Sequence, residues 1–492
     1  MKKQVFNPYL PSWEYIPDGE PHIFDGRVYV YGSHDRFNGE LFCMNDYVCW
    51  SAPVDDLSDW HYEGVIYRKI QDPDNPGGEN VMYAPDVARG PDGRYYLYYG
   101  LADDTKIGVA VCDTPAGQYQ FLSCVHDKNG NSWGKRPQDF MPFDAGVLVD
   151  DDGRIHLYAG QGPLLRRDAA HEYETHFRDS VYYVELEPDM VTMKTEPVRM
   201  LPNLMDSAGS GFEYHEFFEA SSIRKFDGKY YFIYSSVQMH ELCWAVSDRP
   251  DGGFRYGGVL TSNADVGTDG RVTYEDCDKI LDPSVKNYTG NNHGSVAKIG
   301  DDYYVFGHRH TNRHMYSRQA YAEKIEFRDG EFIYTPSTSC GLNGGPLRGV
   351  GTYEARIACH LMSEKGCTFS DNDQVQNMDH PCFTQEGVDR EDCPNQYIAN
   401  LRSGAKALDR YFDFDAYRPA EIEVSVRGEA EGWLRIFDDE DQGTELAAVR
   451  ISVCAEQWQQ FCSEFRAPCG VKPLCFLYEG EGALDFFSFT LK

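Results

Sequence analysis

One pattern of polar and apolar positions recurs five times in the first two-thirds of the chain. Each copy has a polar residue, an apolar run, a tight turn and then an alternating strand rich in aromatic residues. The copies read PDGEPHIFDGRVYVYGS, APDVARGPDGRYYLYYG, FDAGVLVDDDGRIHLYAG, FEASSIRKFDGKYYFIYS and NHGSVAKIGDDYYVFGH. An Asp-Gly pair between alternating apolar residues is a strong hairpin signal. We therefore predict an antiparallel β-hairpin at each copy, the last with a Gly-Asp-Asp turn.

The spacing of these hairpins predicts the architecture. Their turn markers are 67, 60, 75 and 73 residues apart, at Gly26, Gly93, Gly153, Gly228 and Asp301. Further short strands, such as IGVAVCDT and HELCWAVSD, follow each hairpin. Four short strands per repeat at this period predict an all-β fold, a five-bladed β-propeller over residues 1–345. No helical periodicity lies between the strands, which disfavours a (β/α) barrel, and a plain sandwich would not explain the period.

After about residue 346 the period stops. The segments GTYEARIACHLM, YIANLRSGAKALDRYFDF, EIEVSVRGEAEGWLRIF and FLYEGEGALDFFSFTLK alternate like short strands. They predict a β-sandwich of the jelly-roll type over residues 346–492. Sugar binding there would need exposed aromatic side chains, and Trp433 and Trp458 are expected in the core. We therefore expect a packing domain that shields one edge of the propeller.

Composition and charge narrow the functional classes. The chain has 46 Lys and Arg against 79 Asp and Glu, a formal net charge of −33. That charge repels a phosphate backbone, so we exclude nucleic acid as a partner. No apolar stretch approaches the roughly 18 residues that a spanning helix needs. The segment MKKQVFNPYLPSWEY has no apolar run after its lysines, so no signal peptide is predicted.

The fifteen cysteines are an odd number, and none forms a CxxC pair. This argues against a zinc ribbon or a thioredoxin-like site. An odd set cannot all pair within one chain, so we expect reduced and mostly buried thiols in a cytoplasmic protein.

A candidate functional residue stands at nearly the same offset before each turn marker. The offsets are 8, 7, 9, 9 and 8 residues, for Asp18, Asp86, Asp144, Glu219 and His293. The first strand of each propeller blade lines the central channel, so these side chains should converge at one of its mouths. Alternatively, an acidic residue before a strand is only a turn or cap residue. That explanation weakens for all five together, because gathered carboxylates repel one another and cost stability.

The chemistry that fits three converging carboxylates is glycoside hydrolysis. Glu219 lies in the apolar run FFEASSI, where lost hydration would raise its pKa, as a general acid near neutral pH requires. One carboxyl then protonates the departing oxygen, another activates water or attacks the sugar, and a third adjusts its neighbours. The sequence contains no GxSxG elbow, Walker motif, dinucleotide fingerprint or HExxH motif.

Residues 5–345 resemble glycoside hydrolase family 43. The resemblance rests on four motifs, NPYLPSWEYIPDGEPHIFDGRVYVYGSHD, YAPDVARGPDGRYYLYYG, FDAGVLVDDDGRIHLYAG and FFEASSIRKFDGKYYFIYS, in this order and spacing. It implies a five-bladed propeller and an inverting enzyme that acts on arabinofuranosyl and xylosyl units of plant polysaccharides. It further implies that Asp18 is the general base, Asp144 raises the pKa of the acid and orients it, and Glu219 is the general acid.

The resemblance implies roles for further residues. Asp86 would be a wall of the sugar subsite or a structural residue, and His293 would lie beside a structural Ca²⁺ or a water in its place. Arg318 would reach toward the sugar or the base, with Arg313 as a rival, unless either is a surface charge. Other candidates for the base are Glu20, in the unusual PDGEP sequence, and then Asp25 and Asp35.

Together these features predict an inverting exo-glycosidase that needs no cofactor for its chemistry. Its partner would be a neutral plant oligosaccharide, and its reaction the release of terminal α-L-arabinofuranosyl units from arabinoxylan or arabinan fragments. The alternatives are a β-D-xylosidase acting on xylo-oligosaccharides and a sugar-binding propeller without catalysis. Inversion predicts about 6.5–9.5 Å between Asp18 and Glu219, whereas about 5 Å would indicate retention.

Two further expectations concern the surroundings of this site. The ending LDFFSFTLK resembles the last strand of a family 6 carbohydrate-binding module. Pocket depth should depend on the loops at residues 160–180 and 262–290.

We expect a bacterial origin for the chain, and the sequence assigns no oligomeric state.

Overall fold

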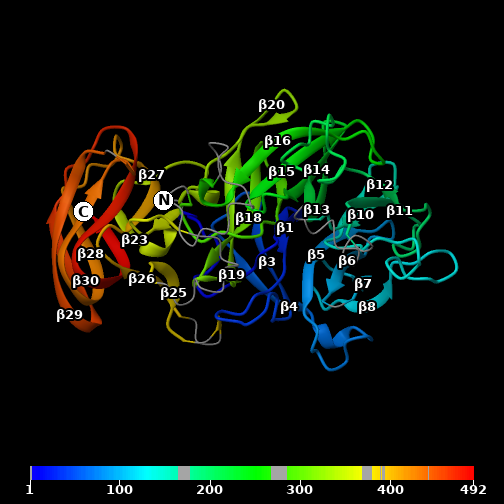
Figure 1. Cartoon of the computed structure of the whole chain (residues 1–492), viewed down its shortest axis with the longest axis horizontal. Helices are drawn as coiled ribbons and strands as arrows, with labels where there is room; N and C mark the ends of the chain where they lie inside the picture. The colour runs from blue at the N-terminus through cyan, green and yellow to red at the C-terminus, as the bar shows by residue number, and fades with distance from the viewer. Residues whose placement is uncertain are drawn as a thin grey trace.

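The chain folds into a propeller and a second β-sheet unit at its C-terminal end (Figure 1). The structure is a computed structural model that describes residues 3–102, 104–163, 178–266, 285–367, 379–387, 389–390, 394–441 and 443–492. Within these residues the only helical pieces are 3-10 turns: Lys69–Gln71, Asn263–Asp265, Gly341–Asn343 and Ala355–Ile357. The search of the same residues for a helix that could cross a membrane found none. The all-β prediction is confirmed.

Five consecutive sheets form the blades, each antiparallel and in simple sequence order. Blade I holds β1 (Glu20–Phe24), β2 (Arg27–Tyr31), β3 (Tyr47–Pro53) and β4 (His61–Tyr67). Blade II holds β5 (Met82–Arg89), β6 (Tyr95–Leu101), β7 (Ile107–Cys112) and β8 (Gln120–Cys124), and blade III holds β9 (Gly146–Val149), β10 (Ile155–Gly160), β11 (Val181–Leu186) and β12 (Val198–Arg199). Blade IV holds β13 (Phe217–Phe226), β14 (Lys229–Ser236), β15 (Glu241–Ser247) and β16 (Arg255–Ser262), and blade V holds β17 (Ser295–Ile299), β18 (Asp302–Thr311) and β19 (His314–Ile325). A small pair, β20 (Phe327–Arg328) and β21 (Glu331–Phe332), follows blade V.

The innermost strands close a ring. β1 contacts β5, β5 contacts β9, β9 contacts β13, β13 contacts β17, and β17 returns to β1. This closure confirms the five-bladed propeller, and it brings equivalent positions of distant repeats to one axis.

The Asp-Gly turns lie where the repeat predicted them. Gly26, Gly93, Gly153 and Gly228 all adopt positive φ, between 78° and 84°, at the turn between the first two strands of blades I to IV. A residue without a Cβ reaches this conformation without steric cost, which explains why the turn needs glycine.

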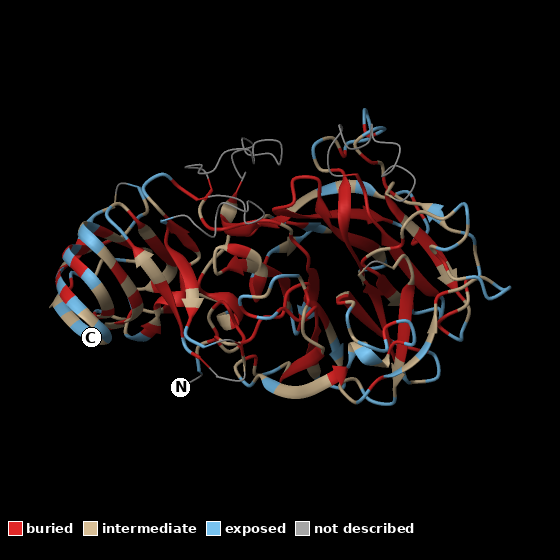
Figure 2. Cartoon of the chain, turned by 60° about the horizontal axis from the view of Figure 1, so that its bottom comes forward, coloured by how far each residue is buried: buried red, intermediate tan, exposed pale blue. Residues whose placement is uncertain are grey.

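Alternation within each strand supplies the packing between blades. In β2, Val28 and Val30 pack against blade V, whereas Tyr29 and Tyr31 belong to the cluster shared with blade II. Comparable buried clusters join blades II and III, III and IV, and IV and V. Each blade is therefore apolar on both faces, as Figure 2 shows by the buried strands throughout the propeller.

The segment before blade I joins the ring to its last blade. The side chain of Asn7 accepts a hydrogen bond from the main-chain N–H of Ala322 (3.0 Å) and donates one to the carbonyl of the same residue (3.0 Å). Its main-chain N–H donates to Ser339 O (3.1 Å), and neighbouring Val5 and Tyr9 are buried between blades V and I. In the described residues blade V has three strands, and Asn7 binds the edge of the outermost one.

The C-terminal unit is one hydrogen-bonded sheet of nine strands. They are β22 (Leu347–Arg348), β23 (Gly351–Glu354), β24 (His360–Met362), β25 (Cys382–Gln385), β26 (Gln396–Leu401), β27 (Lys406–Asp413), β28 (Glu421–Phe437), β29 (Glu445–Glu464) and β30 (Val471–Leu491). The long strand β28 pairs with β29 on one side and β30 on the other. The predicted boundary at residue 345 falls between β21 and β22, and the jelly-roll assignment stays a prediction.

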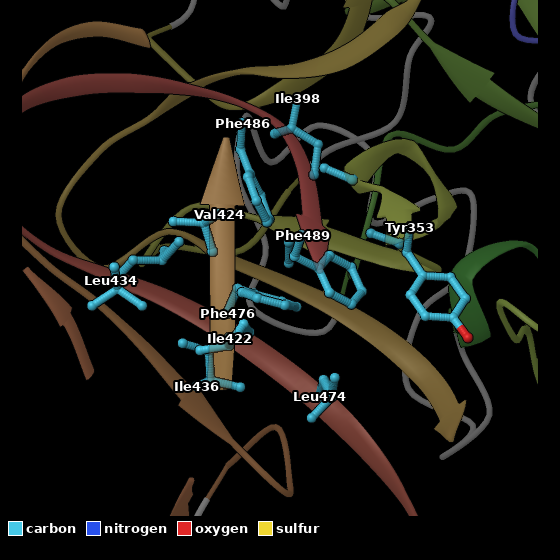
Figure 3. Close-up of a cluster of buried hydrophobic side chains, with 14 of the residues drawn as sticks. Tyr353, Ile398, Ile422, Val424, Leu434, Ile436, Leu474, Phe476, Phe486 and Phe489 are labelled. Atoms are coloured by element: carbon cyan, nitrogen blue, oxygen red, sulfur yellow. The ribbon is translucent and has the colours of Figure 1, made fainter. Parts of the chain in front are cut away.

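This sheet encloses its own core. Alternate residues of β28, from Ile422 and Val424 to Leu434 and Ile436, point inward and meet aromatic side chains of β30, including Phe486 (Figure 3). The other residues of these strands face outward, which produces the banded outer strands in Figure 2.

The expectation that Trp433 and Trp458 are core residues is wrong. Trp433 is 39% exposed and lies under the Arg450 guanidinium, 5.4 Å from its ring centroid. Trp458 is half-buried and stacks on Phe487, with 5.1 Å between the ring centroids. In β28 the buried positions alternate with outward ones, and Trp433 occupies an outward position.

Candidate active site

A cavity of about 420 Å³ opens where the first strands of the blades converge. Its polar lining contains Asp18, Asp144, Gln161, Arg178, Glu219, Asn291, His293 and Arg318, and its apolar lining contains Phe42, Tyr83, Ala84, Met141, Phe143, Phe218, Met239 and Met315. Four of the five residues in the repeating register, all except Asp86, therefore meet in one cavity. Three acidic side chains from blades I, III and IV share it with two arginines and a histidine.

Asp18 is a buried carboxylate held by a cation. It precedes β1 with φ of 59°, a left-handed conformation that is unusual for a residue with a side chain and typical of functional sites. Arg318 Nη1 donates to Asp18 Oδ1 (3.1 Å), and the main-chain N–H of Asp18 donates to His308 Nδ1 (3.3 Å). Burial alone would raise the pKa of Asp18, but Arg318 and His308 lower it well below its usual range. Asp18 is therefore ionised at neutral pH.

Arg318 is fixed by a second carboxylate behind it. Its Nε and Nη2 donate to the two oxygens of Asp35, at 2.9 and 3.0 Å, a fork-shaped pairing that sets the guanidinium plane. The Phe42 ring covers it, with the guanidinium carbon 4.5 Å from the ring centroid. Arg318 is 2% exposed, so its charge acts at close range on Asp18 with little screening by water.

Glu219 is placed by an irregularity in blade IV. The pairing of β13 with β14 shifts register on both sides of Glu219, and Ala220 adopts φ of 68°. Such a bulge re-aims a side chain that would otherwise follow the strand. Glu219 Oε2 accepts a hydrogen bond from Gln161 Nε2 (2.9 Å). Burial, and then the neighbouring Asp144, raise the pKa of Glu219 to about 8, against an opposing effect of the Gln161 bond. Glu219 is therefore protonated at neutral pH.

Asp144 connects the acidic group to the channel histidine. Its Oδ2 accepts a hydrogen bond from the main-chain N–H of Ala220 (3.0 Å), the residue after Glu219, and lies 3.5 Å from His293 Nδ1. Burial raises the pKa of Asp144 above its usual value, although His293 opposes the shift. Burial would lower the pKa of His293, but Asp144 and Glu20 raise it well above the usual value. Asp144 thus fixes the backbone beside Glu219 and lies close to a cationic imidazole.

Residues 22–332 of the chain match the family model described as glycosyl hydrolases family 43. The chain belongs to glycoside hydrolase family 43. It is 47% identical over 493 residues to a xylosidase/arabinosidase of Thermoclostridium stercorarium, across 100% of this chain and 99% of that protein. It is also 26% identical to an arabinoxylan arabinofuranohydrolase of Paenibacillus polymyxa, across 95% of this chain and 72% of that one.

A solved structure supports the fold over the whole length. The family 43 arabinoxylan arabinofuranohydrolase of Bacillus subtilis, in complex with cellotetraose, has a TM-score of 0.50 to this chain at 19% identity, with coverage of 100% and 99%. At this identity the similarity concerns the fold alone. Membership of family 43 makes the chain a glycoside hydrolase, and enzymes of the family invert the anomeric centre and need no cofactor for their chemistry.

Asp86 does not line the cavity of this family 43 chain, which corrects the expectation that it forms a wall of the sugar subsite. It is fully buried. Its Oδ1 is 2.6 Å from His22 Nε2 and its Oδ2 accepts the main-chain N–H of Val147 (2.8 Å), the second residue of β9. The two oxygens therefore join the first strands of blades I, II and III. Asp86 thus has the structural role that the sequence analysis gave as the alternative to a subsite wall.

The rival candidates occupy other positions. Glu20 pairs with Arg224, whose Nη2 lies 2.5 Å from Glu20 Oε2, and Asp25 lies in the exposed turn between β1 and β2. Asp35 holds Arg318, as described above. Arg313 donates to the carbonyl of His380 (2.7 Å) and does not line the cavity. Arg318 is therefore the one of the two arginines that reaches the candidate base.

The side chains around His293 do not fit a calcium ion. Ca²⁺ takes about six to eight oxygen ligands. Glu20 Oε1 lies 3.7 Å from His293 Nε2 and has no hydrogen-bond partner among the described residues, but Glu20 Oε2 is bonded to Ser222 and Arg224. His22 and Asp86, which lie within ligand distance of Glu20, are bonded to each other. One free oxygen beside a cationic imidazole is a poor cage for a divalent cation.

Several cavity residues were missed by the sequence analysis. Gln161, Asn291 and Met315 carry no motif: Gln161 directly follows β10, Asn291 lies in the connection before β17, and Met315 is the second residue of β19. The loops at 160–180 and 262–290, expected to set pocket depth, lie in part outside the described residues. Arg178, at the edge of the first of these loops, lines the cavity.

The C-terminal unit braces two cavity loops. Asp389 accepts hydrogen bonds from the main-chain N–H of Phe37 (3.1 Å) and from Asn45 Nδ2 (3.2 Å), at the two ends of the loop that carries Phe42. The carbonyl of Phe383 accepts the N–H of Asn312 (2.8 Å), in the turn that precedes Met315. The unit therefore touches the propeller at loops that shape the cavity.

A larger cavity, of about 550 Å³, lies between blade V and the C-terminal sheet. Its walls include Tyr303, Tyr411 and Val471, and it contains none of the residues of the repeating register. We place the active site in the smaller cavity because four residues of the repeating register converge there. Two of them, Asp18 and Glu219, are an ionised and a protonated carboxyl, the pair that acid–base chemistry needs.

Proposed function

We propose that this enzyme releases terminal pentose units, with α-L-arabinofuranose of arabinoxylan or arabinan oligosaccharides as the first candidate substrate. In this proposal Glu219 is the general acid, Asp18 the general base, and Asp144 the residue that raises the pKa of the acid and orients it. The observation that carries the proposal is the opposite protonation of two carboxyls in one cavity, Glu219 neutral and Asp18 ionised at pH 7. Such a pair defines the acid and the base of a glycosidase.

The proposed reaction follows from that pair. Glu219 gives its proton to the glycosidic oxygen as the bond to the anomeric carbon breaks. Asp18 removes a proton from a water whose oxygen bonds to that carbon from the opposite face, and the configuration inverts. The transferred protons return through solvent once the sugar leaves. Asp144 keeps Glu219 protonated by charge repulsion and holds the Ala220 backbone.

The size and walls of the cavity support the release of one end unit. About 420 Å³ is at the small end of the roughly 300–1,000 Å³ of ligand pockets. The rings of Phe42, Tyr83 and Phe143 give apolar faces for the C–H groups of a sugar, and Asn291 offers polar atoms to its hydroxyls. A neutral terminal pentose suits this lining better than a long chain.

The second candidate is β-D-xylosidase activity on xylo-oligosaccharides. It is favoured by the 47% identical relative, whose name joins both activities, xylosidase/arabinosidase. One acid–base pair could serve both sugars, because the protonated oxygen and the attacking water would lie on the same axis in each.

The test compares 4-nitrophenyl α-L-arabinofuranoside with 4-nitrophenyl β-D-xyloside. We expect the higher kcat/KM on the arabinofuranoside and a loss of at least about a hundredfold in kcat for Asp18→Ala. For Glu219→Ala we expect the same loss on an arabinose disaccharide, because its sugar leaving group needs the acid more than a nitrophenolate does. Proton NMR of the first product should show the inverted anomer. Full turnover by both variants, or retention of configuration, would refute the assignment, and a preference for the xyloside would select the second candidate. The carboxyl separation of about 6.5–9.5 Å stays a prediction for a crystal structure with bound sugar.

We also propose a cytoplasmic location, supported by the buried free thiols Cys43, Cys49 and Cys243 and the exposed ones Cys454, Cys462 and Cys469, which suit a reducing compartment. Cell fractionation checks it, and recovery of the protein outside the cell would contradict it.

A further inference from the structure

Gln161 lies on a backbone that is bonded to both acidic motifs. The N–H of Gly160, at the end of β10, donates to the carbonyl of Phe143 (2.8 Å), and the N–H of Gly162 donates to the carbonyl of Phe218 (2.6 Å). Phe143 and Phe218 directly precede Asp144 and Glu219. The position of Gln161 relative to both carboxyls is therefore set by main-chain bonds on either side.

The two flanking glycines allow this close approach. A Cβ at Gly162 would come within 2.2 Å of the carbonyl oxygen of Phe217, and one at Gly160 within 2.0 Å of that of Ser180. No side chain fits at those distances. The chain thus passes between blades III and IV with Gln161 as the residue that carries a side chain there, and that side chain is 7% exposed.

The amide of Gln161 meets the acid on one oxygen. Its Nε2 donates to Glu219 Oε2 (2.9 Å), and its Oε1 has no hydrogen-bond partner among the described residues. An amide NH₂ can only donate. A proton on Glu219 Oε2 would therefore face a second donor hydrogen, whereas a proton on Oε1 meets no such conflict.

We propose that Gln161 is a positioning residue that directs the catalytic proton of Glu219 to Oε1 by occupying Oε2. The inference rests on the proposed role of Glu219 as the general acid. Without Gln161 the proton would distribute over both oxygens and the carboxyl could rotate. The leaving oxygen would then receive the proton from a fraction of the correct arrangements only, and bond cleavage that depends on protonation would slow.

The sign of one titration distinguishes this arrangement from its reverse. A donor on Oε2 stabilises the carboxylate, so Gln161 lowers the pKa of Glu219, against the effects of burial and Asp144. Loss of the donor should therefore raise the pKa of Glu219 and move the alkaline limb of the kcat/KM profile to higher pH. The expected shift is about one pH unit for one hydrogen bond to a charged group. If the amide were reversed, with Oε1 accepting the acid proton, loss of Gln161 would lower that limb.

The experiment uses Gln161→Leu in the full chain and compares two substrates with the same terminal pentose. One carries a 2,4-dinitrophenyl leaving group, and the other carries a second sugar. A 2,4-dinitrophenyl leaving group departs without protonation, whereas a second sugar needs the acid. We expect kcat of Gln161→Leu to fall about 10- to 100-fold on the disaccharide and less than about threefold on the dinitrophenyl glycoside, within the range of general acid catalysis. The alkaline limb should move upward.

The control is Gln238→Leu. Gln238 is also buried, 8% exposed, and its Nε2 donates to the carbonyl of Tyr214 (2.9 Å) and not to a carboxyl. Gln238→Leu should change kcat by the same factor on both substrates and leave the alkaline limb of kcat/KM at its native pH. Should Gln161→Leu fail to fold, as judged by its melting curve, Gln161→Met replaces it, because Met has nearly the shape of Gln and also lacks the donor.

Glu219→Gln separates failure of this inference from failure of the proposed function. If Glu219→Gln shows no dependence on the leaving group, Glu219 is not the acid and the proposed function falls. If Glu219→Gln shows that dependence but Gln161→Leu loses activity equally on both substrates, or its limb moves downward, the role of Gln161 is refuted while the proposed function stands.

Discussion

Replacement of Glu219 by glutamine should make the enzyme inactive toward natural linkages and, at the same time, more stable as the pH rises. The pKa of the carboxyl is about 8 in the folded chain, against an ordinary value of 4.5. A group whose pKa is raised by folding gives its full contribution below the ordinary value and loses it as the pH rises through the folded value. The native protein therefore loses stability between about pH 4.5 and pH 8, and the glutamine variant does not.

The size of the effect follows from the shift. Each pKa unit corresponds to about 1.36 kcal/mol, so 8 − 4.5 gives about 5 kcal/mol above pH 8 and about 3 kcal/mol at pH 7. These are upper limits, because Glu219 lines a cavity and is 8% exposed, so part of its carboxyl can be reached by solvent. Even half of this free-energy difference would raise the melting temperature of Glu219→Gln by a few degrees over that of the native protein.

The assay is a set of thermal melts of the native protein and Glu219→Gln at pH 4, 7 and 9. The two should coincide at pH 4 and separate progressively toward pH 9, with the variant higher. Asp18→Asn is the matched control of opposite sign, because the pKa of Asp18 is lowered by folding and its charge stabilises Arg318. A difference in melting temperature that does not change with pH would refute the idea that burial of Glu219 costs stability.

Three further predictions concern the base, the acid and the cavity loop. The kcat/KM of the native enzyme should fall in a one-proton step near pH 8 as Glu219 ionises, and a profile that stays flat to pH 10 would contradict its role. Arg318→Met should remove the cation that opposes burial most strongly and so raise the pKa of Asp18. The acidic limb of kcat/KM should then move to higher pH, and an unmoved limb would contradict the pairing. Asp389→Ala should free the loop that carries Phe42, at a cost of about 1.5–3 kcal/mol in local stability. Hydrogen exchange at residues 36–45 should then quicken and KM rise several-fold, whereas Asp379→Ala, whose side chain is 63% exposed, should match the native enzyme.

The ring and the carboxyls of the candidate site were predictable because both depend on short-range signals. An Asp-Gly turn fixes a hairpin locally, and five hairpins at one period place Asp18, Asp144 and Glu219 at equivalent positions. The same register failed for Asp86, since it cannot tell a side chain that faces the cavity from one whose oxygens are already used by His22 and Val147.

Longer-range features were beyond the sequence. The choice of Arg318 over Arg313 depends on which side of the turn between β18 and β19 faces the propeller axis. Gln161 is placed by the main-chain bonds of Gly160 and Gly162, which reach Phe143 before its own blade and Phe218 in blade IV. Asp389 reaches the cavity loop from a position more than 340 residues away. Contacts of this kind arise only when distant segments meet, and no local pattern records them.

The hydrogen bonds between Asn7 and Ala322 have a consequence for folding during translation. The two residues are 315 positions apart, and a ribosome that adds about 5–20 residues per second needs roughly 15–60 s to make the chain between them. During that time the valine face of β2 and the indole of Trp50 lack the blade that will cover them. The incomplete propeller therefore exposes apolar surface that can aggregate during translation. A chaperone that shields exposed strands at that stage should increase the yield of folded protein.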